Sequence, residues 1–156
     1  MGESRESITR MGLYGLIPLA IATAGVWLSP WIVSAGTAYD LSELALGYVA
    51  IVASYIAGVG AGGVFSKSMP TPESLGPGII AAMAAWLAAW PQGALFISLP
   101  SGARYLIAIG VLVYLWLRDK RAVTEGLLPA WYGALRTRLT FWACLFLLAI
   151  VAHAYL

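Results

Sequence analysis

The stretch LALGYVAIVASYIAGVGAGGVF, residues 44–65, decides the fold of this chain. It consists mostly of apolar and small residues and contains no charged side chain. An α-helix needs about 20 such residues to cross the roughly 30 Å of hydrocarbon in a lipid bilayer. The stretch is therefore predicted to be a transmembrane helix.

The rest of the chain has the same character. Apolar residues make up 61% of its 156 residues and charged residues only 10%, whereas soluble domains carry about 25% charged residues. The sequence therefore predicts a single integral membrane domain, an all-α bundle of five transmembrane helices. The other four spans are expected at about residues 13–33, 75–92, 103–117 and 139–156.

Basic residues set the orientation of these spans, because cytoplasmic loops of membrane proteins carry an excess of Lys and Arg. If the N-terminus lies inside, only Arg104 of the 9 Lys and Arg residues falls on the outer side. The other eight fall on the inner side: Arg5, Arg10, Lys67, Arg118, Lys120, Arg121, Arg136 and Arg138. This bias predicts a multi-pass protein with its N-terminus inside and its C-terminus outside, and the membrane is expected to be a bacterial inner membrane.

Residues 118–138 are the one sizeable piece that is not predicted to span. A helix beginning near Pro129 is expected to lie at the inner interface, where Trp131, Tyr132 and Arg136 would sit at the level of the lipid headgroups. This helix is predicted to run into the last span with little or no break. One interpretation is a docking surface for anionic lipid or a partner protein; the other is a membrane-surface anchor that turns the chain around.

Small residues recur along the 44–65 span and predict a packed helix. In a bilayer, small residues at every fourth position let two helix backbones approach closely, because lipid gives helices no hydrophobic drive to associate. We expect this helix at the centre of the bundle, with a helix–helix contact at its small residues. The stripe comprises Ser54, Ala57, Gly58, Ala61 and Gly62.

Two pairs of tryptophans suggest a pocket. Trp27 and Trp31 are one helical turn apart, and so are Trp86 and Trp90. Four indoles near the outer leaflet could line a pocket for a planar apolar ligand. Anchoring of helix ends in the headgroup layer explains them equally well.

Residues that carry chemistry are scarce. The chain has one cysteine, Cys144, and one histidine, His153, which exclude an internal disulfide, a bis-histidine haem and a multi-histidine metal site. No ionisable residue falls in the middle of a predicted span, and Arg104 is expected to reach the outer interface by snorkelling. We therefore expect no enzyme activity, no cofactor and no metal.

Several short motifs occur in the order and spacing of a known family: Gly15-Leu16-Ile17-Pro18, Ser54-Tyr55-Ile56-Ala57-Gly58-Val59, Ala85-Trp86-Leu87, Arg118-Asp119-Lys120-Arg121, and Leu128-Pro129-Ala130-Trp131-Tyr132 with Leu135-Arg136 and Leu139-Thr140. With these motifs the chain resembles the transmembrane-protein-sixty-nine-like family, small polytopic proteins of bacterial inner membranes and mitochondria without an established activity. The resemblance covers most of the chain and implies a membrane location and about five spans. Gly60 and Ala61 stand where that family tends to carry a His-Trp pair, so a function that needs the pair is not implied here.

Two functional hypotheses follow. The first is a non-catalytic accessory or assembly subunit that packs against a larger respiratory or photosynthetic membrane complex. The second is a binding protein or carrier for an apolar small molecule such as a quinone, sterol or tetrapyrrole, held between the tryptophans. In either case the expected partners are the lipid bilayer and other membrane proteins, and no nucleic acid.

Overall fold

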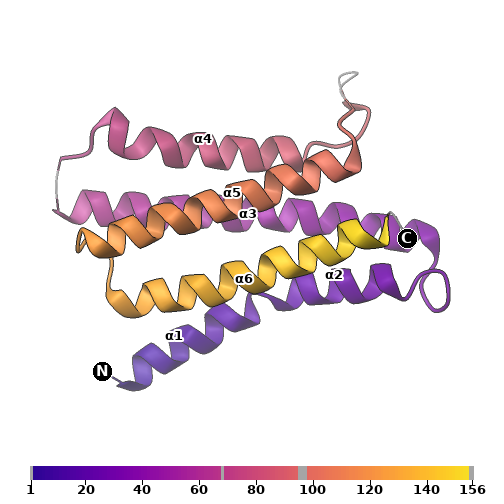
Figure 1. Cartoon of the computed structure of the whole chain (residues 1–156), viewed down its shortest axis with the longest axis horizontal. Coiled ribbons are helices and arrows are strands. Elements are labelled where there is room, and N and C mark those ends of the chain that lie inside the picture. The colour runs from indigo at the N-terminus through magenta and orange to yellow at the C-terminus, as the bar shows by residue number, and fades with distance from the viewer. Residues whose placement is uncertain (1, 68, 95–97, 155–156) are drawn as a thin grey trace.

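The computed structural model describes residues 2–67, 69–94 and 98–154, and within these residues every regular element is a helix. The helices run side by side, and the two chain ends lie at opposite ends of the bundle (Figure 1). The all-α prediction is therefore confirmed. The elements are α1 (Gly2–Tyr14), α2 (Ile17–Trp27), α3 (Ala35–Lys67), α4 (Pro72–Ala88), α5 (Ser101–Thr124) and α6 (Ala130–His153).

The first predicted span, 13–33, is divided between two helices. The backbone N–H of Gly15 donates to the carbonyl oxygens of Met11 and Gly12, both at 3.1 Å, and this tight turn ends α1. Pro18 lies in the first turn of α2, where its missing N–H leaves no hydrogen bond unmade. The polar residues before the predicted span are also helical, because they form most of α1. Helix α2 ends at Trp27, before the predicted limit at residue 33.

Helix α3 is longer than the predicted 44–65 span, because its first turns take in residues 35–43, which lie between the first two predicted spans. The Ser34 hydroxyl accepts a hydrogen bond from the N–H of Thr37 at 3.1 Å, which caps the start of the helix. At 1.5 Å per residue, its 33 residues extend well beyond the thickness of a bilayer core.

Helices α4 to α6 also differ from their predicted limits. Helix α4 starts at a capping box, in which the hydroxyls of Thr71 and Ser74 accept from each other's N–H at 3.3 and 3.0 Å. The segment 118–138 is not a separate interfacial element: its first residues continue α5, and its last belong to α6. Helix α6 then runs from Ala130 to His153 without interruption, so the expected continuity with the last span is confirmed. Residues 155–156 of that predicted span lie outside the described residues.

Within the part of the chain that the structure describes, four segments are long and apolar enough to cross a membrane: Glu6–Trp27, Ala35–Ser66, Ser101–Thr124 and Ala130–His153. Their outer surfaces carry many exposed apolar side chains, such as those of Ile51 and Tyr55, which are 69% and 73% exposed. Such a surface is unfavourable in water and favourable in lipid. By length and composition, the chain is a multi-pass membrane protein. Helix α4, with 17 residues, is shorter than these segments and packs against α3 and α5.

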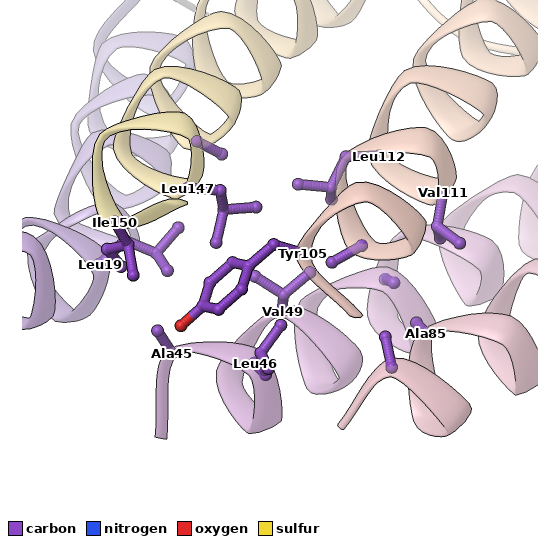
Figure 2. Packing of buried hydrophobic residues seen from close by; sticks show 14 of the residues in the cluster. Leu19, Ala45, Leu46, Val49, Ala85, Tyr105, Val111, Leu112, Leu147 and Ile150 are labelled. Carbon is purple, nitrogen blue, oxygen red and sulfur yellow. The ribbon is translucent and has the colours of Figure 1, made fainter. Parts of the chain in front are cut away.

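The core lies where α2, α3, α5 and α6 meet. Tyr105 of α5 reaches into the middle of a cluster that includes Leu19, Val49, Leu147 and Ile150 (Figure 2). Its hydroxyl donates to the carbonyl oxygen of Ser42 at 2.8 Å, so this buried polar atom is satisfied. Helix α3 contacts α2, α4 and α5, and α5 contacts α3, α4 and α6, so the central place predicted for α3 is shared with α5.

Candidate functional site

Arg104 is the most deeply buried charged side chain among the described residues, with 1% of its side chain exposed. It donates two hydrogen bonds to the carboxylate of Glu43 on α3, at 2.5 and 2.8 Å. It also donates to the carbonyl oxygens of Ala88 and Trp90, at 2.8 and 2.9 Å. These carbonyls end α4, where the helix dipole favours a cation. Arg104 therefore ties α3, α4 and α5 together, and its predicted snorkelling is wrong.

A second buried ion pair lies toward the other end of α5. Nε of Arg136 on α6 donates to Oδ2 of Asp119 at 2.7 Å, and the two side chains are 6% and 5% exposed. Nearby, Arg118 donates to the carbonyl oxygen of Ser74 at 2.6 Å and so links α5 to α4. Arg136 is thus not the accessible cation expected from the sequence, because its guanidinium faces the interior of the bundle.

A largely apolar cavity of about 560 Å³ lies beside this second pair. Side chains of α1, α2, α3, α5 and α6 line it, and they include Tyr48, Tyr55, Tyr132, Arg136 and Thr140. Nη2 of Arg136 and the hydroxyl of Thr140 are buried and have no hydrogen-bond partner among the described residues. Buried polar atoms usually have partners, so this pair of atoms marks the cavity as a candidate site.

The predicted small-residue stripe of α3 does not face the interior. Ser54, Gly58 and Gly62 are exposed, and a Cβ atom built at Gly58 or Gly62 would meet nothing within 4 Å. The prediction that these glycines lie at a helix–helix contact within the chain is therefore wrong. Ala57 and Ala61 are half-buried beside α4, and together these residues border an open groove of about 430 Å³.

The glycines that do permit close packing lie elsewhere. A Cβ atom at Gly78 of α4 would collide with the guanidinium of Arg118, and one at Gly25 of α2 with Leu41. Small residues allow two helices to approach closely. Their spacing alone does not reveal which face of a membrane helix is internal, because both faces are apolar.

The two tryptophan pairs do not line one pocket. Helix α2, with Trp27 near its end, runs along one edge of the bundle, and α4, with Trp86, runs along the opposite edge (Figure 1). The Trp27 indole N–H donates to the carbonyl oxygen of Ala149 at 3.0 Å, and its ring lies 5.6 Å from that of His153. Trp86 and Trp90 contact each other edge to face at 4.7 Å. The predicted four-indole pocket is therefore not formed.

Trp131 and Tyr132 lie together in the first turn of α6, with ring centroids 6.2 Å apart. Both are half-buried, and Tyr132 lines the cavity beside Arg136. Contact of Trp131 with lipid headgroups or a partner stays a prediction.

Sequence reasoning missed Glu43, Asp119, Thr140 and the burial of Arg104. One signal was available: Glu43 and Arg104 are opposite charges that the five-span reading places at the same end of the bundle. Likewise, Asp119 is the one acidic residue in a basic cluster that follows an apolar helix. An unpaired ionisable group near a membrane is costly, so each of them should have prompted a search for a partner.

Residues 4–152 match the family DUF3429, described as a protein of unknown function. The chain belongs to the DUF3429 family. No curated protein and no solved structure matches the chain. The family description carries no activity, and the more specific resemblance to the transmembrane-protein-sixty-nine-like family stays a prediction.

Proposed function

We propose that this DUF3429 protein is a non-catalytic accessory subunit that packs against helices of other membrane proteins through α3. The observation that carries the proposal is the outward direction of the small-residue face at Ser54, Gly58 and Gly62. Within the described residues this face has no packing role, yet small residues at this spacing are those that let two membrane helices approach closely.

The groove beside this face supports the proposal. It runs between α3 and α4 and is lined on one side by Ser54, Ala57, Gly58 and Ala61, and on the other by residues such as Trp86. A transmembrane helix laid into the groove would contact both helices. It would gain dispersion energy over a long, smooth surface, which is the main attraction available in lipid.

A single substitution separates association from folding. Gly58→Leu places a large side chain in open space, so yield and the free energy of unfolding should stay close to those of the wild type. Co-purification with partner subunits in mild detergent should be lost, because the side chain blocks close backbone approach. Gly110→Leu is the matched control, since Gly110 is also an exposed helical glycine with an open Cβ position.

The result decides the proposal in either direction. Partners that are lost with Gly58→Leu and kept with Gly110→Leu support docking on α3. Unchanged association in both variants contradicts docking on α3. A cross-link between two copies of the chain at Ser54 indicates a homo-oligomer instead of an accessory subunit.

We further propose five crossings, with the N-terminus at the cytoplasmic face of a bacterial inner membrane. The support is the charge bias of eight basic residues to one, together with the course of α4, which packs against α3 and α5 and runs antiparallel to both (Figure 1). Reporter fusions after Thr71 and after Pro100 should read cytoplasmic and non-cytoplasmic, respectively. The reverse pair of readings contradicts the orientation, and identical readings contradict the crossing of α4.

A further inference from the structure

We propose that the cavity beside Arg136 binds a neutral, apolar carbonyl compound of the quinone type, whose carbonyl oxygen accepts hydrogen bonds from Arg136 and Thr140. This site is independent of the α3 groove. The cavity volume of about 560 Å³ falls within the range of about 300–1,000 Å³ that is typical of small-molecule sites.

Two converging donors define the polar end of the site. Arg136 and Thr140 are one helical turn apart on the same face of α6, and both line the cavity. The guanidinium has five N–H donors, and the hydrogen bond to Asp119 uses the one on Nε. Nη2 and the Thr140 hydroxyl are both buried without a protein partner among the described residues. A single oxygen atom with two lone pairs could accept from both groups.

The charge of the site favours a neutral ligand. Asp119 already balances the guanidinium of Arg136, through a contact of 2.7 Å. Among the described residues that line the cavity, Arg136 is the only one with a charged side chain. A carboxylate or phosphate would therefore bring a second anion to one cation in a medium of low dielectric constant, which is unfavourable. A carbonyl oxygen accepts the same hydrogen bonds without this penalty.

The remaining walls fit a flat, apolar body. Tyr48, Tyr55 and Tyr132 supply aromatic rings, on which a conjugated ring can stack. Most other lining residues are aliphatic, and they can accommodate an alkyl or isoprenoid tail.

The cavity is open toward the bilayer through exposed side chains of two helices. Met11 of α1 and Tyr55 of α3 line the cavity and are 72% and 73% exposed. An apolar ligand dissolved in the membrane can therefore reach the site from the side, without passing through water.

Decylubiquinone is a suitable probe, measured as saturable binding to the full chain in lipid nanodiscs in excess of binding to empty nanodiscs. Thr140→Val keeps the shape of the side chain and removes the unpartnered hydroxyl, so the variant should fold. Loss of one hydrogen bond should raise the dissociation constant about 2- to 10-fold. Thr137→Val is the control, because Thr137 is exposed on the same helix and absent from the cavity lining; its binding should match the wild type.

Infrared spectroscopy gives a readout that does not depend on the measured affinity. The carbonyl stretching band of bound decylubiquinone should shift to lower frequency in the wild type and shift less in Thr140→Val. The absence of saturable binding, or equal affinity and an equal band position in Thr140→Val and the wild type, would overturn the proposal. Displacement of the quinone by palmitate at lower concentration would overturn the assignment of a neutral head group.

Discussion

Removal of Arg104 should be the most damaging single substitution at the α4–α5 end of the bundle. Arg104→Ala deletes a guanidinium that makes four hydrogen bonds of 2.5–2.9 Å, two with Glu43 and two with the carbonyls of Ala88 and Trp90. What remains is a partly buried carboxylate and two helix-terminal carbonyls without their donor.

The magnitude follows from what is left behind. Breaking a buried ion pair by removing one partner costs about 3–5 kcal/mol. Glu43 is 27% exposed, so water can partly solvate the carboxylate that has lost its partner. The cost of breaking this ion pair is therefore expected at the lower end of that range. The carbonyls of Ala88 and Trp90 each lose a hydrogen bond from a charged donor, which increases the total loss in the free energy of unfolding. We therefore expect Arg104→Ala to lower the free energy of unfolding by about 4 kcal/mol.

Equilibrium unfolding of the detergent-solubilised protein, followed by tryptophan fluorescence, measures this difference. Glu43→Gln should cost less than Arg104→Ala, because an amide oxygen can still accept from the guanidinium while α4 keeps its two bonds. Arg10→Ala is the control: it removes an ion pair of 2.6 Å to Glu6 whose side chains are both about two-thirds exposed, and it should change stability little.

A double-mutant cycle tests the coupling of the two charges. Arg104→Ala combined with Glu43→Ala should cost clearly less than the sum of the two single changes, because neither charge is then left alone. Strict additivity, or a loss below about 1 kcal/mol for Arg104→Ala, would refute the view that Arg104 holds this end of the bundle together.

Three further predictions concern other parts of the bundle. Asp119→Asn leaves Arg136 with an uncompensated buried charge, so the free energy of unfolding should fall by about 3 kcal/mol in the same titration. Gly78→Ala pushes a Cβ atom into a guanidinium of α5 and should destabilise by about 1 kcal/mol, whereas Gly58→Ala, with open space around it, should not destabilise. Gly126→Ala forces a φ of +72° on alanine at the end of α5 and should cost about 1 kcal/mol; equal stability of the Gly126 and Gly58 variants would contradict the strain at Gly126.

The sequence was sufficient for the class of the fold but not for its helix limits. Apolar stretches reveal where a chain can enter a bilayer, and each predicted span overlaps a helix of the structure. Hydropathy alone underestimates length where charged residues continue a helix. Helix α5 runs to Thr124 past Asp119, because Asp119 finds a partner on α6.

The candidate site was not predictable from local patterns. Its donors, Arg136 and Thr140, lie near the start of a span, where the sequence suggests contact with headgroups. Their burial depends on how α1, α2 and α5 pack against α6, which is a tertiary arrangement. For the same reason the small residues around Gly58 were assigned to the wrong face: in a membrane protein, hydrophobicity does not distinguish an internal face from a lipid-facing one.

The two ion pairs also fix the direction in which α5 can run. Arg104 near its start meets Glu43, and Asp119 toward its end meets Arg136. If α5 were inverted between the same neighbours, Arg104 would come to the level of Arg136, and Asp119 to the level of Glu43. Two attractions would become two like-charge encounters, each unfavourable by several kcal/mol. The positions of these charges therefore favour one direction of α5 over the other when the helices assemble.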